Sequence, residues 1–220
     1  MDIHEAIYTT RVMRRMTRDP IPLDVQAHIL DAAIRAPSEP DARRFLLVDD
    51  PEMKRELAAH YLAVWESLTD PATIPPRFAR TFRSVDHLAR HFAEVPLLLI
   101  GFSTSSASLG GSVFPALQNA MLAARAAGVG STLTMFLNSR QDEVRALLGV
   151  PADGPWRMVA CVALGYPTGR WGIAPRRPAH EVTFRNHWGE PPGFAAPAPL
   201  WEPADGTERQ RERPGEPIIW

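Results

Sequence analysis

Three arginines stand close together near the start of the chain, in the segment Thr10-Arg11-Val12-Met13-Arg14-Arg15. Guanidinium groups stay ionised, so three of them at this spacing repel one another unless solvent or an anion relieves the repulsion. A phosphate monoester suits this role because its oxygens accept charge-assisted hydrogen bonds. A second pair, Arg176-Arg177, could close on the same phosphate. The pattern therefore predicts either a phosphate site or a solvated basic surface.

Two further segments place polar groups where a ligand could use them. In Arg35-Ala36-Pro37-Ser38, the proline stops a helix, and the serine offers a hydroxyl and backbone donors in the loop that follows. In Ala116-Leu117-Gln118-Asn119-Ala120, two amides interrupt an apolar helix and need hydrogen-bond partners. Each segment also has a structural interpretation, as a plain helix end in the first case and as internal hydrogen bonding in the second.

Other kinds of site find little support. Cys161 is the single cysteine, which excludes an intrachain disulfide. It lies in an apolar run, which favours a buried thiol. Gly128-Val129-Gly130 follows a predicted helix and precedes a strand, the reverse of a dinucleotide-binding turn. His87 and His91 share a helix face without further ligand motifs, so we predict no metal site. P-loop and GxSxG motifs are absent, which removes support for NTPases and hydrolases.

The composition describes an ordinary globular chain. It has 220 residues, 45% of them hydrophobic, with 24 basic against 25 acidic side chains. This balance creates no overall field for nucleic acid or an anionic membrane, so we expect neither partner. The N-terminus lacks a signal-peptide pattern, and no apolar run reaches the length of a membrane span. We therefore expect a cytoplasmic protein.

Hydrophobic periodicity and turn residues predict alternating helices and strands around these motifs. Asp50 and Pro51 are suited to the cap and first position of the second helix. A proline-rich loop is expected over residues 70–80. Helices are expected over residues 23–34, 51–65, 85–92, 116–127 and 141–148, and strands over 45–48, 96–101, 131–137 and 157–165.

Four motifs in this order resemble the FMN-dependent nitroreductase family across nearly 190 residues. The first is Arg-x-x-Arg-Arg, which precedes a Pro-x-Pro segment and a helix ending Ala-Pro-Ser. The most specific is Ala-x-Gln-Asn-x-x-Leu-x-Ala-Arg-x-x-Gly-x-Gly, matched by residues 116–130. Leu164-Gly165-Tyr166-Pro167 and Arg176-Arg177-Pro178 complete the set, which ends at Trp188-Gly189.

The resemblance implies an α+β fold with a mixed, mainly antiparallel sheet flanked by helices. It also implies an intertwined homodimer with FMN at the interface. We expect an FMN-binding domain over residues 1–189 and a proline-rich extension over 190–220, either disordered or lying over a partner subunit. The residues expected to contact FMN are Arg11, Val12, Met13, Arg14, Arg15, Pro37, Ser38, Asp41, Thr134, Met135, Arg176 and Arg177.

In this assignment the arginines hold the phosphate, with their register left open. The Pro37-Ser38 loop comes from the other subunit, and Thr134-Met135-Phe136 lies near the reactive edge of the flavin. The chain departs from the family after Ser38, where Glu39-Pro40-Asp41 replaces the usual Gly-Gly-Asn. Asp41 thus puts an acceptor-only carboxylate in place of an amide, with consequences for flavin affinity and redox potential.

The resemblance implies an oxidoreductase that takes electrons from NADH or NADPH. It would reduce a nitroaromatic, a quinone or a related conjugated acceptor in a ping-pong cycle. Because the flavin carries the chemistry, no side-chain catalyst is assigned. Two alternatives remain, a flavin oxidase or dehydrogenase of a biosynthetic pathway and a non-catalytic flavin-binding or sequestering protein.

Overall fold

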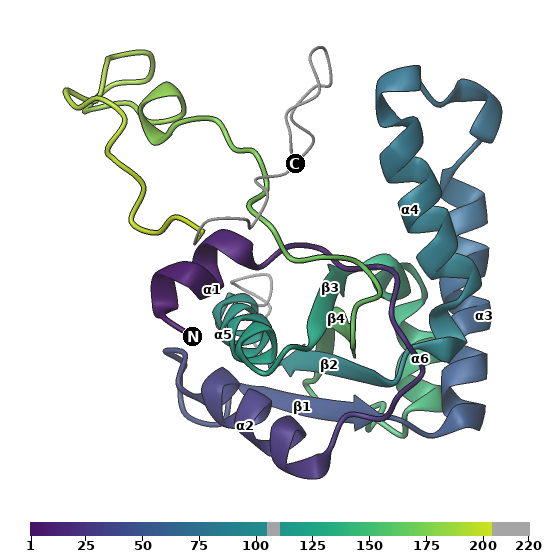
Figure 1. Cartoon of the computed structure of the whole chain (residues 1–220). Coiled ribbons are helices and arrows are strands. Elements are labelled where there is room, and N and C mark those ends of the chain that lie inside the picture. Colours follow the sequence, from purple (N-terminus) through teal and green to yellow (C-terminus); the bar gives the residue numbers. More distant parts are fainter. Residues whose placement is uncertain (105–110, 204–220) are drawn as a thin grey trace. The chain divides into compact units, whose positions relative to one another are not determined.

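The computed structural model describes residues 1–104 and 111–203 of the chain. It consists of two compact units (Figure 1). The larger unit is Arg11–Arg170, and the smaller one joins Met1–Thr10 to the chain from Trp171 onward. The larger unit contains the sheet and most of the predicted site residues.

A four-stranded sheet in the order β1-β2-β4-β3 forms the centre of the larger unit. All neighbouring strands in it are antiparallel, and an isolated parallel bridge joins Val12 to Ser131 beside β3. The predicted α+β class with a mainly antiparallel sheet is therefore confirmed. The strands are β1 (Arg43–Val48), β2 (Leu97–Ser103), β3 (Gly130–Thr134) and β4 (Arg157–Gly165).

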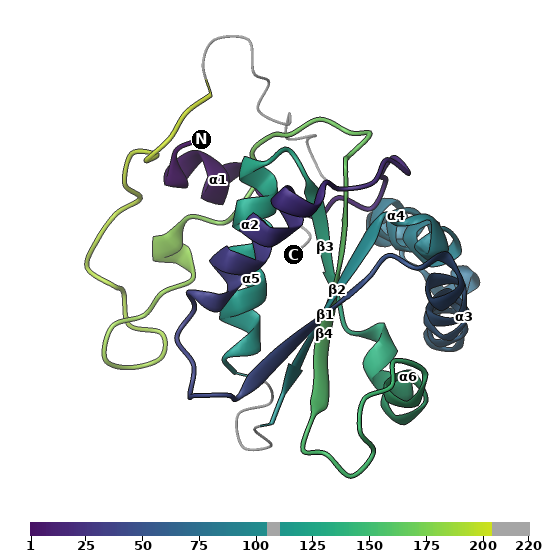
Figure 2. The same cartoon turned by 90° about the horizontal axis from the view of Figure 1, so that it is seen from below.

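Helices cover both faces of this sheet, as the continuous apolar run of β2 predicts. Figure 2 shows α2 and α5 on one face and α3, α4 and α6 on the other. Alternate residues of β2 serve the two cores: Leu97 and Leu99 belong to the first, and Leu98 and Ile100 to the second. The helices are α2 (Leu23–Ile34), α3 (Pro51–Leu68), α4 (Ala79–Arg90), α5 (Val113–Ala126) and α6 (Gln141–Leu147).

Helix caps explain where several elements begin. The Asp50 carboxylate accepts a hydrogen bond from the Met53 amide at 2.8 Å, and Pro51 occupies the first turn of α3, as predicted. The expected start of α4 at residue 85 is wrong, because the helix begins at Ala79. Pro76 opens a short 3-10 helix directly before it. A proline in a first turn removes no helical hydrogen bond, so here it starts helical structure rather than ending it.

The strand expected over residues 131–137 ends earlier, at Thr134, and Phe136–Arg140 forms a 3-10 helix. The Phe136 ring lies 5.3 Å from that of Tyr61 and 5.8 Å from that of Trp65. This aromatic packing, which the local sequence does not reveal, turns the chain away from the sheet after Met135.

The smaller unit contains α1 (Ile3–Thr9) and a 3-10 helix, Ala179–Glu181, joined by irregular chain. The Leu200 amide donates a hydrogen bond to the Tyr8 hydroxyl at 3.0 Å, which ties the proline-rich extension to α1 at this residue. The proposed boundary at residue 189 stays a prediction. Residues 204–220 of the proline-rich extension lie outside the described residues.

Candidate functional site

The arginine segment, Arg11–Arg15, runs along the outer edge of β3. The Met13 amide donates to the Ser131 carbonyl at 3.0 Å, and the Thr132 hydroxyl donates to the Met13 carbonyl at 2.5 Å. These contacts and the bridge from Val12 make the segment a short additional strand, parallel to β3. The arginines are therefore held on extended backbone at a defined edge of the sheet.

Two glycines of the family motifs allow this close approach. A Cβ atom on Gly130 would lie 3.0 Å from the Cβ of Met13, and one on Gly165 would lie 3.0 Å from the Cβ of Met16. A backbone hydrogen bond from the Thr17 amide to the Tyr166 carbonyl, at 2.8 Å, continues the contact. These motifs thus have a structural role, because any larger residue at either position would push the arginine segment away from the sheet.

Arg14 and Arg15 point towards α4. An Arg14 Nη1 donates to the Ser84 hydroxyl at 3.5 Å, and an Arg15 Nη1 lies 2.9 Å from Nδ1 of His87. Burial lowers the pKa of the half-buried Arg14 guanidinium. Burial and the nearby Arg15 charge lower the pKa of His87, so its ring stays neutral and its Nδ1 can accept from Arg15.

The end of β3 lies at the same edge as the arginine segment. Thr134 is buried, and its hydroxyl shares a 3.0 Å hydrogen bond with the Tyr61 hydroxyl. Burial raises the pKa of Tyr61 to about 12. Two large apolar side chains, Val12 and Met135, are each 51% exposed here. The structure therefore brings together arginines and open apolar surface from two of the predicted FMN-binding segments.

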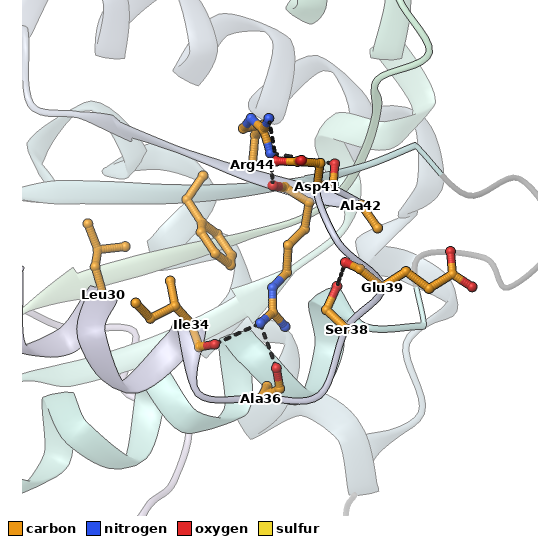
Figure 3. A pocket seen from close by; sticks show the side chains of 10 residues that line it. Leu30, Ile34, Ala36, Ser38, Glu39, Asp41, Ala42 and Arg44 are labelled. Carbon is orange, nitrogen blue, oxygen red and sulfur yellow. Dashed lines mark hydrogen bonds and ion pairs between the residues drawn. The ribbon is translucent and has the colours of Figure 1, made fainter.

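A pocket of about 570 Å³ lies at the opposite edge of the sheet, beside β1 (Figure 3). The predicted residues Ser38 and Asp41 line it, and Pro37 precedes them in the same exposed loop. The Ser38 hydroxyl donates to the Glu39 carbonyl at 2.9 Å, so part of its hydrogen-bonding capacity is already used. The pocket is lined by Leu30, Ile34, Ala36, Ser38, Glu39, Asp41, Ala42, Arg43, Arg44 and Phe45.

Asp41 has an unusual backbone conformation in this loop. Its φ of 55° lies in the left-handed region, which aspartate tolerates better than most residues. Its carboxylate pairs with Arg44 at 3.2 Å, and the Arg44 guanidinium lies 4.9 Å from the centre of the Trp156 ring. With its side chain 88% exposed, the Asp41 carboxylate remains accessible to a ligand or to another chain.

Arg43, the first residue of β1, supports this loop, a structural role that the sequence does not reveal. Its guanidinium donates to the carbonyls of Ser112 (3.1 Å), Ile34 (2.9 Å) and Ala36 (2.6 Å). It thereby satisfies carbonyls at the C-terminal end of α2, and its positive charge interacts favourably with the negative end of the helix dipole. The last turn of α2 contains no basic residue of its own. This feature of the sequence could have indicated that a residue outside the helix caps these carbonyls.

Replacing Arg43 by lysine should therefore loosen the Ser38 loop. Lysine keeps the charge, but its donors all sit on one nitrogen, so it cannot span the three carbonyls as the planar guanidinium does. We therefore expect the free energy of unfolding to fall by about 1–2 kcal/mol. Urea denaturation measures this loss, and amide exchange should rise over residues 36–42. Arg44→Lys is the matched control, because the exposed Arg44–Asp41 pair should contribute less than about 1 kcal/mol. Equal losses in both variants would contradict the assigned role of Arg43.

The predicted residues of the larger unit thus form two groups at opposite edges of the sheet. The arginine segment and Thr134-Met135 lie beside β3, whereas Ser38 and Asp41 lie beside β1. Three strand spacings separate β1 from β3, or roughly 14 Å. Within one chain, the sheet itself keeps the two groups apart.

Arg176 and Arg177 are exposed residues of the smaller unit. Arg176 donates to the Pro175 carbonyl at 2.9 Å, and Arg177 pairs with Glu181 at 3.4 Å. Their convergence with the arginine segment on one phosphate stays a prediction.

The remaining candidates have structural explanations. Asn119 donates to the Ala32 carbonyl at 3.3 Å and so links α5 to α2, whereas Gln118 is exposed. Cys161 is buried as predicted, and burial raises its pKa to about 12, which disfavours a reactive thiolate.

Within residues 1–104 and 111–203, no three His, Cys, Asp or Glu side chains are placed to hold a metal ion. No helix in the same ranges is long and apolar enough to cross a bilayer.

Comparison with known proteins points to one family. The family model described as "Nitroreductase family" matches residues 7–166. An "NADH dehydrogenase" from Thermus thermophilus is 30% identical over 205 residues, covering 84% of this chain and 96% of the relative. An "NADPH-flavin oxidoreductase" from Vibrio harveyi is 28% identical, covering 84% and 74% of the two chains. A nitroreductase structure with bound FMN from Desulfitobacterium hafniense superposes with a TM-score of 0.66 at 20% identity, covering 85% of this chain and 100% of that one.

Proposed function

Because the chain belongs to the nitroreductase family, we propose that it is an FMN-dependent oxidoreductase that takes electrons from NADH or NADPH. The relatives named above include an NADH dehydrogenase and an NADPH-flavin oxidoreductase, which supports this class of activity. We further propose that it passes the electrons to a nitroaromatic, a quinone or a related conjugated acceptor.

The residues at the β3 edge suit the two chemical parts of FMN. A phosphate monoester needs cationic donors, which the arginine segment supplies, and a flat aromatic ring needs apolar surface, which Val12 and Met135 leave open. Arg11 is our candidate for the phosphate, because the side chains of Arg14 and Arg15 are directed at α4. Arg176 or Arg177 would complete the phosphate site.

The separation of the two residue groups carries the proposal of a homodimer. One chain holds the arginine segment and the Ser38 loop at opposite edges of its sheet, so the two groups could line one flavin only if a second copy supplies the loop. In that arrangement the carboxylate of Asp41, still accessible beside Arg44, would come from the partner copy. Each site would then be built from both chains.

The protein's own contribution would be binding, orientation and shielding. Bound FMN would supply hydride transfer from a nicotinamide and onward electron transfer to the acceptor, in a ping-pong order. Buried Thr134 and Tyr61 would fix the end of β3, so that Met135 keeps a constant position beside the ring. The described side chains at this edge include no group that the chemistry requires as an acid or base.

The absorption spectrum of the purified full chain tests this function. We expect a yellow protein that bleaches on anaerobic addition of NADH or NADPH and regains its colour when a quinone or nitroaromatic is added. A yellow protein that neither nicotinamide bleaches would instead favour an oxidase or a flavin-sequestering protein. A colourless protein that cannot be reconstituted with FMN would overturn the assignment as a whole.

A further inference from the structure

Helix α4 presents two neutral side chains to the arginine segment. Nδ1 of His87 lies 2.9 Å from an Arg15 Nη1. The Ser84 hydroxyl accepts from an Arg14 Nη1 at 3.5 Å. A guanidinium only donates hydrogen bonds, so Nδ1 of His87 is the accepting nitrogen of its ring. Positions 84 and 87 are one turn apart on the same helix face, so Ser84 and His87 form one platform for both arginines.

The C-terminal end of α4 is tied to the arginine segment a second time. The His87 ring packs against that of His91 with ring centroids 4.3 Å apart. Nδ1 of His91 lies 3.2 Å from the Glu94 carboxylate, which pairs with the Arg18 guanidinium at 2.9 Å. These contacts connect Arg15 to Arg18 through α4 and the turn that follows it, so the platform and the segment are held in one geometry.

Neutral partners direct the two arginines without neutralising their charge. Asp86 is the only acid of α4, and it pairs with Arg90 at 3.0 Å instead. Burial and the nearby charges of Arg15 and His91 lower the pKa of His87, so its ring is neutral at neutral pH. A neutral imidazole orients the Arg15 guanidinium by accepting from it and does not compensate its positive charge.

Arg14 lies close to the end of β3, beside the apolar surface that suits the flavin ring. Burial raises the pKa of Tyr61 to about 12, and the charge of Arg14 acts on the same hydroxyl in the opposite direction. That hydroxyl lies 3.0 Å from the Thr134 hydroxyl, and Met135 follows directly and is 51% exposed. Arg14 and its neighbour Arg15 are therefore at the ring end of the proposed flavin site.

We propose that His87 and Ser84 are positioning residues, which hold Arg15 and Arg14 towards the flavin ring and thereby raise its reduction potential. This inference rests on the proposed function, because it concerns FMN bound at the β3 edge. Hydride transfer from a nicotinamide delivers two electrons and one proton, so the ring gains one negative charge. Guanidinium groups already fixed beside the ring stabilise that charge without having to reorganise. Loss of the platform therefore disfavours the reduced flavin.

The test measures the reduction potential of FMN bound to the full-length chain, by anaerobic titration against a redox dye. In His87→Ala, the affinity for reduced FMN should fall about three- to ten-fold relative to the affinity for oxidised FMN, a drop in potential of about 15–30 mV. His87→Asn should restore the potential, because its amide oxygen can accept from Arg15 as Nδ1 does. Ser84→Ala should cause a smaller drop.

A double variant shows whether His87 acts through Arg15. Arg15→Gln should lower the potential at least as much as His87→Ala, and combining the two should cause no further drop. His60→Ala is the matched control, because His60 lies on α3 and its Nδ1 contacts Glu143 at 3.3 Å rather than the arginine segment. This control should keep the potential of the unsubstituted protein.

Three results would overturn the inference. The first is an unchanged potential in His87→Ala, and the second is a drop in His87→Asn as large as that in His87→Ala. The third is a double variant in which the two drops add, which would mean that His87 acts independently of Arg15. In all three cases the proposed function stands if the unsubstituted protein binds FMN and a nicotinamide reduces it. Failure of the unsubstituted protein to bind FMN would instead remove the proposed function and this inference with it.

Discussion

Replacing Tyr61 by alanine is expected to lower the free energy of unfolding by about 3–5 kcal/mol, the usual cost of deleting a buried aromatic ring. The Tyr61 side chain is 1% exposed and stacks on Phe92 with ring centroids 4.1 Å apart. It also holds the Thr134 hydroxyl at 3.0 Å and packs against Phe136. One substitution would therefore open a cavity between α3 and the end of β3. Urea denaturation followed by circular dichroism measures the loss.

Tyr61→Phe separates the contribution of the ring from that of the hydroxyl. It keeps the packing and leaves the Thr134 hydroxyl without its partner, so we expect a loss of only about 0.5–1.5 kcal/mol. A Tyr61→Ala loss no greater than that of Tyr61→Phe would show that the ring contributes nothing, against the packing observed. FMN affinity should fall in Tyr61→Ala more than in Tyr61→Phe, because Met135 follows Thr134 directly.

The same pair of variants gives a signature at alkaline pH. Burial raises the pKa of Tyr61 to about 12, whereas a tyrosine in an unfolded chain titrates near about 10. The neutral phenol is therefore favoured in the folded state, and its stabilising effect is complete below pH ~10 and lost as the pH rises towards ~12. Buried Cys161 adds a loss of the same sign in both proteins. Tyr61→Phe should consequently lose less stability over this interval than the unsubstituted chain.

Elements with strong local signals were predictable from the sequence. The helix expected over residues 23–34 and the strand expected over 157–165 are observed with those bounds, because proline, apolar period and continuous burial all lie within the segments themselves. The family resemblance is confirmed by the family model over residues 7–166. By contrast, the early end of β3 depends on Phe136 packing against Tyr61 and Trp65, partners that belong to α3.

The candidate site shows the same division between local and distant signals. The arginine segment and the Ser38 loop stand out in the sequence, yet the orientation of Arg14 and Arg15 does not. Their partners, Ser84 and His87, lie 70 and 72 residues further along the chain. Only the packing of α4 against α3 decides that contact. Arg43 was missed for a similar reason, because its role depends on where α2 ends in space.

Replacing Arg11 by alanine is expected to weaken FMN binding by about 1.5–3 kcal/mol, or roughly 10- to 150-fold in Kd. The backbone at Arg11 is held next to β3 by the bridge between Val12 and Ser131, so the substitution should remove a phosphate contact without moving the segment. Fluorescence quenching of FMN on titration with apoprotein measures the affinity. Riboflavin, which lacks the phosphate, should bind both proteins equally.

The comparison of FMN with riboflavin makes this prediction specific to the phosphate. If Arg11→Ala weakened both ligands alike, Arg11 would contact the ring or support the fold, and unchanged FMN affinity would exclude it from the site.

Arg177→Ala extends the test to the smaller unit. If both guanidinium groups hold one phosphate, the double variant should lose an amount that differs from the sum of the single losses, because groups sharing a partner are coupled. Strict additivity would mean that the two arginines act at separate places, and the flavin phosphate would then need another second donor.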